Sequence, residues 1–186
     1  MIETIGKPNS ERDELDFYAT DPKAVEKLLQ KENITSSSYI LENSAGNGHI
    51  TKVLRDEGFK VFTVDIIKRD FKLNKVCDYL KMNELFNFDY AIYNPPFKLI
   101  TEFILHTFKF TNIQYVFGRI QLLETINRYE KLFKNNYLEK VMVFSGRITT
   151  AKGGDDSLFG KNNSMCFAWF KFNKNNTNKT VLEWIK

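Results

Sequence analysis

The sequence predicts an α/β domain built around a mostly parallel sheet. Short apolar runs alternate along the chain with segments of helical periodicity, as in strand–helix–strand units. A glycine-rich turn joins one such run to a helix, and an acidic residue ends the next run 19 positions after the first glycine. The 186 residues suit one domain, and 42% of them are hydrophobic, which is enough to form a core.

Composition excludes several classes of protein. No apolar run approaches the roughly 20 residues that span a bilayer, and the first residues lack the basic and apolar pattern of a secretion signal. Cys77 and Cys166 stand in apolar surroundings without the spacing of metal ligands, so we expect buried thiols and no structural zinc. Together these features favour a cytoplasmic protein that binds neither a membrane nor a metal.

The N-terminal segment predicts a mobile arm followed by a capped helix. Residues 1–16 are polar and charged, a composition typical of an unattached terminus. From residue 17 the sequence reads Phe-Tyr-Ala-Thr-Asp-Pro, and a helix is expected over residues 23–31. Thr20 or Asp21 can cap this helix, and the proline that follows suits a first helical turn.

The next segment has the arrangement of a nucleotide-binding loop. Tyr39–Glu42 is expected to be a strand, residues 43–48 a glycine turn and His49–Glu57 a helix. A second strand, Lys60–Val64, ends at Asp65, and an acid about 20 residues after the glycine turn can bind a ribose diol. The third glycine of a dinucleotide motif is missing. This favours S-adenosyl-L-methionine over NAD, because the former has no pyrophosphate.

A short polar motif follows a further buried strand. The apolar run over residues 90–93 leads into Asn94-Pro95-Pro96-Phe97. Consecutive prolines end the strand because neither has an N–H for the ladder, and the first proline also holds Asn94 in an extended conformation. The sequence therefore presents a rigid carboxamide at the carboxyl edge of the sheet, where open α/β sheets bind their ligands.

The second half of the chain supplies the remaining scaffold. We expect helices over 98–110 and 121–134, and strands over 112–117, 138–144, 164–172 and 180–185, with one antiparallel strand near the C-terminus. Residues 145–163 contain four glycines and no strand pattern, and 173–179 form an Asn-rich turn. We find no internal repeat and no second domain.

Three motifs resemble those of DNA adenine methyltransferases of the bacterial and phage type. Residues 41–50 are similar to the family's cofactor motif, Leu-Glu-Pro-Ser-Ala-Gly-x-Gly-x-Ile, with Asn43 in place of proline, so we expect a less stiff loop. Residues 17–22 are similar to its aromatic-x-Thr-x-Pro motif, and 94–97 to its Asn-Pro-Pro-aromatic motif. The resemblance covers about residues 15–172 and implies a class I, Rossmann-like fold with a seven-stranded sheet.

The resemblance also implies roles for individual residues. It implies cofactor contacts at Tyr18, Thr20, Glu42, Ser44, Ala45, Gly46, Gly48, Asp65, Ile66, Asp78, Tyr79 and Asn94, and catalytic roles for Asn94, Pro95, Pro96 and Phe97. In the family, the Asn oxygen and the carbonyl of the first proline accept hydrogen bonds from an exocyclic amine, and the aromatic residue stacks on the target base. Asp78 is expected to contact the cofactor's adenine amine or, alternatively, to cap a helix over 80–86. His49 and His106 are expected to be structural.

The function that the resemblance implies is methylation of the N6 amine of adenine in DNA, with S-adenosyl-L-methionine as donor. The alternatives are an RNA base (adenine N6 or guanine N2), a protein glutamine, or a non-catalytic cofactor-fold binding module. Oligomeric state and recognition sequence stay open.

Charge favours a nucleic-acid partner. Residues 98–186 carry 14 Lys and Arg against seven Asp and Glu, a basic excess that is typical of proteins with a polyanionic partner. Since no separate target-recognition domain is visible, we expect Arg147, Lys152 and Lys161 to contact DNA phosphates. The glycine-bearing segment 145–163 and the N-terminal arm are then expected to flank the catalytic motif.

Overall fold

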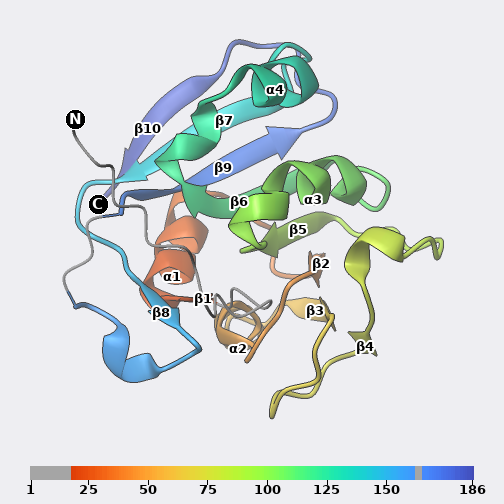
Figure 1. The fold of residues 1–186 in the computed structure, drawn as a ribbon, viewed down its shortest axis with the longest axis vertical. Coiled ribbons are helices and arrows are strands. Elements are labelled where there is room, and N and C mark those ends of the chain that lie inside the picture. The colour runs from red at the N-terminus through yellow and green to blue at the C-terminus, as the bar shows by residue number, and fades with distance from the viewer. Residues whose placement is uncertain (1–17, 162–164) are drawn as a thin grey trace, which may run out of the picture.

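The computed structural model describes residues 18–161 and 165–186, and an eight-stranded sheet runs through it (Figure 1). The strands are β2 (Tyr39–Glu42), β3 (Lys60–Asp65), β4 (Lys75–Val76), β5 (Tyr90–Tyr93), β6 (Ile113–Arg119), β7 (Leu138–Phe144), β9 (Phe167–Asn173) and β10 (Val181–Ile185). Their order is β10-β7-β9-β6-β5-β2-β3-β4, and only the pairs that β9 makes with β6 and β7 are antiparallel. The mostly parallel α/β fold expected from the sequence is confirmed. The arm expected over residues 1–16 lies outside the described residues.

The sheet has one strand more than the seven expected: the unpredicted strand is the two-residue β4, which pairs parallel with β3. The last expected strand, over residues 180–185, is present as β10. β10 lies parallel to β7, with Val181 opposite Lys140 and Ile185 opposite Phe144. Its sequence, Val-Leu-Glu-Trp-Ile, is rich in the β-branched and aromatic residues that favour strands. β10 thus forms the edge of the sheet beside β7, in the segment where a strand was expected.

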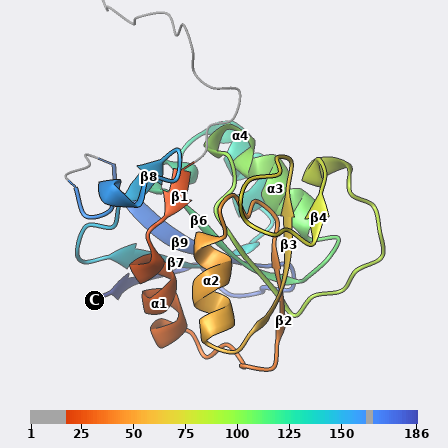
Figure 2. The same cartoon turned by 90° about the horizontal axis from the view of Figure 1, so that it is seen from below.

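Helices cover both faces of the sheet (Figure 2). α1 (Pro22–Lys31) and α2 (His49–Asp56) pack their apolar sides on one face, and α3 (Ile100–Thr107) packs on the other. The start of α1 is as expected, since the Asp21 side chain accepts a hydrogen bond from the Lys23 N–H at 3.0 Å. The fold thus has one apolar core on each side of the sheet, as a parallel sheet requires.

The helix expected over residues 121–134 is broken in the structure. A 3₁₀ turn at Ile120–Leu123 is followed by the short α4 (Ile126–Arg128) and a π-helical turn at Tyr129–Phe133. Thr125 lies between them with a φ of 86°, a conformation that a β-branched residue rarely adopts. Its hydroxyl accepts a hydrogen bond from the Arg128 N–H, so Thr125 ends the first turn and caps the next.

A second, two-stranded sheet lies beside the first. β1 (Tyr18–Thr20) pairs antiparallel with β8 (Thr150–Lys152), with Thr20 opposite Thr150. No strand was expected within residues 145–163, and this expectation was wrong. A three-residue strand is too short to show an alternating pattern, and its partner lies 130 residues away. In Figure 2 this pair of strands stands outside the main sheet, beyond α1 and α2.

The antiparallel strand β9 occupies the middle of the sheet. Phe167, Ala168, Trp169, Phe170 and Phe172 are all buried, because the strand has helices or loops on both faces. The Trp169 indole N–H donates to the carbonyl oxygen of Ala24 at 2.8 Å, which fastens β9 to α1. A strand buried on both faces shows an unbroken apolar run, and this is why the strand could be found in the sequence.

The expectations about cysteines, membranes and metals can be compared with the described residues. Cys166 is exposed and Cys77 is partly buried, so the expectation of two buried thiols was wrong. Within residues 18–161 and 165–186, no helix is long and apolar enough to cross a bilayer. The same part of the chain contains no group of three or more His, Cys, Asp or Glu side chains that could hold a metal ion.

Candidate active site

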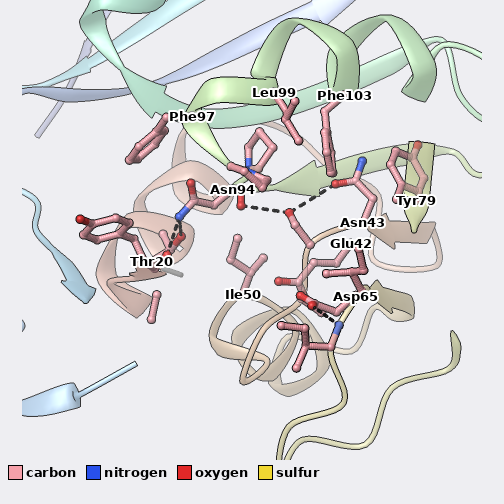
Figure 3. Close-up of a pocket in the computed structure, with 18 of the residues that line it drawn as sticks. Thr20, Glu42, Asn43, Ile50, Asp65, Tyr79, Asn94, Phe97, Leu99 and Phe103 are labelled. Carbon is pink, nitrogen blue, oxygen red and sulfur yellow. Dashed lines mark hydrogen bonds between the residues drawn. The ribbon is translucent and has the colours of Figure 1, made fainter. Parts of the chain in front are cut away.

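A cavity of about 510 Å³ lies at the carboxyl ends of β2, β3 and β5 (Figure 3). Ten of the expected cofactor residues line it, namely Tyr18, Thr20, Glu42, Ser44, Ala45, Asp65, Ile66, Asp78, Tyr79 and Asn94, and so do the expected catalytic residues Pro95, Pro96 and Phe97. Residues chosen from separate motifs are therefore brought together at one edge of the sheet. Two expected residues, Gly46 and Gly48, form the adjoining loop without lining the cavity.

The two glycines shape the loop between β2 and α2. Gly46 has a φ of 52° and donates its N–H to an oxygen of Asp65 at 2.8 Å. Gly48 has a φ of 74°, and a Cβ built on it would lie 2.4 Å from the ring of Phe71. Glycine is required at position 48 for both reasons. The atoms that leave no room for a Cβ here belong to the ring of Phe71.

Asp65 is fixed in the cavity wall by the backbone around it. Oδ2 accepts the Gly46 N–H at 2.8 Å, and Oδ1 accepts the Ile67 N–H at 2.9 Å. Each carboxylate oxygen has a further lone pair for a hydroxyl donor in the cavity. The acid that ends β3 is thus held in place before any ligand binds.

Glu42 is almost completely buried beneath the glycine loop, with 1% of its surface exposed. The pKa of its carboxyl is raised to about 8, chiefly by burial and to a smaller extent by the nearby Asp65 carboxylate, against the opposing effect of the hydrogen bond that the Thr51 hydroxyl donates. Glu42 is therefore mostly protonated at neutral pH. It brings a neutral carboxyl group, not a fixed negative charge, to this part of the cavity.

The orientation of Asn94 is set by β1. Its side-chain nitrogen donates to the Tyr18 carbonyl oxygen at 2.8 Å and to the Thr20 hydroxyl at 3.0 Å (Figure 3). A carbonyl oxygen can only accept, so the nitrogen must face β1 and the oxygen must face away from it. No hydrogen bond from the described residues reaches the side-chain oxygen of Asn94 or the carbonyl oxygen of Pro95. Both acceptors are available to a ligand.

Ser44 links the glycine loop to the Asn-Pro-Pro-Phe motif. Its hydroxyl donates to the backbone carbonyl oxygen of Asn94 at 3.0 Å and lies 3.4 Å from the side-chain oxygen of Asn43. Asn43, in turn, donates to the hydroxyl of Thr107 on α3 at 3.0 Å. The loop that follows β2 is thereby tied to both β5 and α3.

Asn43 has a structural role that its place in the sequence did not reveal. It was expected to make the loop less stiff than the usual proline would, but its amide is 1% exposed and hydrogen-bonded at both ends. The Tyr79 hydroxyl lies 3.0 Å from the same Thr107 hydroxyl, and burial raises the pKa of Tyr79 to about 12. This buried network fixes the side chain of Asn43, and it leaves no local signal because it connects residues far apart in sequence.

Asp78 caps a helical turn, one of the two roles that the sequence left open, and it also lines the cavity. Its carboxylate caps the 3₁₀ turn Tyr79–Lys81 by accepting the Leu80 N–H at 3.1 Å, and it lies 3.3 Å from the ammonium of Lys81. The helix expected over 80–86 is only this single turn. Since Asp78 also lines the cavity, it can contact a ligand with the lone pairs that remain.

The ring of Phe97 forms part of an aromatic cluster at the cavity edge. Its centroid lies 6.0 Å from that of Tyr18, with the two planes inclined by 30°, and 6.1 Å from that of Phe167. These contacts come from β1 and β9, on either side of the motif. Phe97 is only partly buried, so the ring keeps a surface for a stacking partner.

His49 lies in the cavity wall, which the sequence did not predict. Its Nε2 is 2.9 Å from Oδ1 of Asp156, and its ring meets Phe159 edge-on at 5.8 Å between centroids. Both partners come from the segment after β8, so His49 connects that segment to the start of α2. His106, by contrast, is buried in packing as expected and contacts the Met82 carbonyl oxygen at 3.0 Å.

Apolar side chains complete the cavity wall. Ile50, Ile67, Leu80, Leu99 and Phe103 line it and were not proposed from the sequence. They come from four separate segments and lie among the polar residues described above. Only the folded chain brings them together, and their signal in the sequence is no more than apolar character.

The three basic residues expected to contact DNA lie outside the cavity. Arg147, Lys152 and Lys161 are all exposed, and Lys152 belongs to β8, which pairs with β1 beside Asn94. The acidic residues of the same segment are engaged within the protein. Asp155 caps the Ser157 N–H at 3.0 Å, and Asp156 contacts His49. The N-terminal arm before residue 17, which was also expected to flank the catalytic motif, lies outside the described residues.

Comparison with solved structures places the fold. A type I restriction-modification methyltransferase subunit from Streptococcus thermophilus is similar with a TM-score of 0.64 and 14% identity, over 91% of this chain and 47% of that chain. A proposed RNA methyltransferase from Pyrococcus horikoshii has a TM-score of 0.58 and 15% identity over 82% of both chains. A dimethyladenosine transferase from Plasmodium falciparum has a TM-score of 0.52 and 17% identity, over 83% of this chain and 62% of that chain.

These similarities are in fold and not in sequence. No protein-family model matches the chain, and no curated protein matches it in sequence. This chain spans about half the length of the type I subunit. Sequence identities of 14–17% establish a common fold and leave the substrate undetermined. The chain has the class I, Rossmann-like fold of S-adenosyl-L-methionine-dependent methyltransferases.

Proposed function

We propose that this chain is an S-adenosyl-L-methionine-dependent methyltransferase that acts on the N6 amine of adenine in DNA. The observation that carries the proposal is the orientation of Asn94. Its nitrogen is held by β1, and its oxygen has no hydrogen-bond partner among the described residues. An amide held in this way is a preorganised acceptor for the N–H groups of an amine in the cavity.

The residues of the cavity fit the cofactor. A volume of about 510 Å³ is in the range of small-molecule sites, which span roughly 300–1,000 Å³. The fixed carboxylate of Asp65 would hold the ribose hydroxyls, and Asp78 the adenine amine. Leu99 and Phe103 offer apolar surface for a purine. β1 and the glycine loop remain for the methionine end.

The cofactor supplies an electrophilic methyl group carried on a sulfonium sulfur. The task of the protein is to prepare the amine, which is a weak nucleophile because its lone pair is delocalised into the ring. Two acceptors outside the ring plane, the Asn94 side-chain oxygen and the Pro95 carbonyl, favour a more tetrahedral nitrogen with an available lone pair. With the cofactor bound, the lone pair of an amine held by Asn94 and Pro95 would take up the methyl group that the sulfonium supplies, the sulfur would keep the bonding electrons as a neutral thioether, and the amine proton would leave to water. No general base is required.

Support for an adenine in DNA comes from the fold comparisons and from charge. The proteins of similar fold include a restriction-modification methyltransferase subunit and a dimethyladenosine transferase. The basic excess after residue 97 and the exposed Arg147, Lys152 and Lys161 suit a polyanion beside the cavity. A base in a duplex must be flipped out of the stack before it is methylated. Phe97 then offers it a stacking contact worth roughly 1–3 kcal/mol.

A base in RNA is the second candidate. The observation that favours it is the similarity to a proposed RNA methyltransferase over 82% of both chains, whereas the type I subunit is about twice as long as this chain. The same acceptors would serve an exocyclic amine in either polymer.

Transfer of tritium-labelled methyl groups to duplex DNA, single-stranded DNA, RNA and protein, assayed in parallel, tests the proposal. We expect label on DNA and, after digestion, in N6-methyladenine. Label on RNA alone would favour the second candidate, and absence of label on all four would contradict the proposed activity. Asn94→Ala serves as the control for a contaminating enzyme.

A further inference from the structure

Arg119 ends β6 and places its guanidinium over the ring of Phe97. The guanidinium carbon lies 4.5 Å from the ring centroid, the geometry of a cation–π contact. β6 pairs with β5, the strand that leads into the Asn-Pro-Pro-Phe motif, so two neighbouring strands bring the two side chains together. Arg119 was not singled out in the sequence, and it does not line the cavity described above.

The guanidinium has no anionic partner within the described part of the chain. Its Nε is buried and makes no hydrogen bond, and no carboxylate lies within 4.0 Å of the side chain. The terminal nitrogens are not among the buried unpaired atoms and are therefore accessible to solvent. An arginine stays charged at any ordinary pH, so this is a permanent, partly buried cation without a counter-ion.

Another partly buried cation of the same sheet, Lys171, has carboxylate partners. Lys171 on β9 lies 2.7 Å from a carboxylate oxygen of Glu139 and 3.2 Å from one of Glu32. A charge removed from water is normally compensated in this way, and an unpaired buried donor calls for an explanation. For Arg119 the aromatic face supplies part of the compensation, but it cannot satisfy the N–H donors.

We propose that Arg119 binds a phosphate of the nucleic-acid strand that carries the target base. This inference rests on the proposed function, and it identifies the substrate as a polynucleotide rather than a protein. A planar guanidinium matches the paired oxygens of a phosphate and prefers them to a neutral amide. Its place beside Phe97, the ring on which the target base is to stack, puts it within reach of the backbone of that nucleotide. The aromatic contact holds the guanidinium in place before the strand arrives.

A purely positioning role is the alternative, in which Arg119 only fixes the ring of Phe97. The two roles differ in what they do to salt dependence. A phosphate contact contributes about 0.9 to the slope of log affinity against log salt for B-DNA. An arginine that acts only through Phe97 can change affinity and turnover through the stacking contact, but it leaves this slope unchanged.

The test measures binding of a fluorescein-labelled pool of duplex DNA by anisotropy, at several salt concentrations and with S-adenosyl-L-homocysteine present. Wild type is compared with Arg119→Met, which keeps length and apolar contact, and with Arg119→Lys, which keeps the charge. Arg128→Met is the matched control, since Arg128 is also partly buried but lies on α4 and donates to the Gln121 carbonyl oxygen. Thermal melting and calorimetry with S-adenosyl-L-homocysteine check that each variant is folded.

We expect Arg119→Met to lower DNA affinity about tenfold at low salt and to reduce the slope by about 0.9. Arg119→Lys should keep most of the slope, and Arg128→Met should keep both quantities. A wild-type slope in folded Arg119→Met overturns the proposal, and so does failure of the wild type to bind nucleic acid. Binding is measured without methyl transfer, so the Arg119 assignment is decided even if the proposed activity fails. If Arg119→Met does not fold, a loss of slope in Arg119→Gln supports the assignment and an unchanged slope overturns it.

Discussion

Asn94 donates an amide hydrogen to the hydroxyl of Thr20, 74 positions earlier in the chain and 3.0 Å away. The other hydrogen goes to the Tyr18 carbonyl oxygen, so both donors of the amide are used by β1. The motif residue expected to touch the substrate is therefore oriented by a strand outside the main sheet. What remains for a ligand is the oxygen, the part of the amide that can accept from an amine.

Replacing Thr20 by Val tests this orientation. The change removes the hydroxyl acceptor with little change in shape, so the amide of Asn94 loses one of two bonds that hold it. We expect turnover to fall roughly three- to tenfold, the effect of one neutral hydrogen bond of about 0.5–1.5 kcal/mol. Thr20→Ser keeps the hydroxyl and should keep most of the turnover. Equal rates for the Val and Ser variants would show that the bond is not needed.

Asn94→Ala should abolish methyl transfer and leave affinity for S-adenosyl-L-methionine within a few fold of wild type. The reason is that Asn94 is proposed to contact the target amine, whereas Asp65, Asp78 and the glycine loop are proposed to hold the donor. Activity assays and calorimetry on the same preparation measure the two quantities. Retained turnover in a folded variant removes Asn94 from the mechanism.

Asp65→Ala should weaken cofactor binding by about 1.5–3 kcal/mol, the range for hydrogen bonds to a charged group. The carboxylate also accepts the N–H groups of Gly46 and Ile67, so its loss should loosen the loop as well as remove the proposed ribose contact. Calorimetry provides the measurement, and Asp56→Ala, at the exposed end of α2, provides the control. Unchanged affinity in folded Asp65→Ala would rule out the ribose assignment.

The raised pKa of Glu42 predicts that the stability of the fold depends on pH. Its pKa is about 8 in the folded protein against a reference of 4.5, so the folded state binds the extra proton between these values. The contribution of this group is therefore fully present below about pH 4.5 and is lost as pH rises through about 8. Glu42→Gln, which cannot ionise, should lose less stability over that window. Denaturant unfolding of both proteins at several pH values gives the comparison, and parallel curves would contradict the pKa of Glu42.

The exposed basic residues of segment 145–163 provide a further prediction. Replacing Arg147, Lys152 and Lys161 together by Ala should weaken DNA binding. The salt slope should fall by up to about 0.9 for each phosphate that the variant can no longer bind. Cofactor affinity should not change, since none of the three lines the cavity.

A matched triple variant separates this local effect from the loss of net charge. Lys131, Lys174 and Lys179 are exposed as well. Lys174 and Lys179 follow the end of β9 that lies opposite the start of β6, away from the cavity. Replacing these three lysines together by Ala should leave most of the salt slope of DNA binding unchanged. An unaltered slope in the first triple variant would place the nucleic-acid surface elsewhere.

The features that could be predicted from the sequence are those encoded over short distances. The glycine turn, the acid that ends β3 and the Pro-Pro stop after Asn94 each fix local backbone, and the structure puts them around one cavity. β9 could be found because its burial on both faces leaves a continuous apolar run.

The features that were missed depend on contacts between distant segments. β8 has three residues and a partner 130 positions away, and Asn43 is significant only through Thr107 on α3. The positive φ of Thr125 divides a segment whose apolar spacing resembles a helix. Arg119 resembles any strand-terminal arginine until the fold brings it over Phe97.

The pairing of β1 with β8 also determines when the site can form during synthesis of the chain. Every residue that lines the cavity precedes residue 104, whereas the partner that β1 requires begins at Thr150. A nascent chain that has just released α3 from the ribosome therefore contains the whole lining but not the strand that steadies the amide of Asn94. Alignment of that amide comes late in synthesis, so a prematurely terminated product would carry the parts of the site without the geometry that makes them competent.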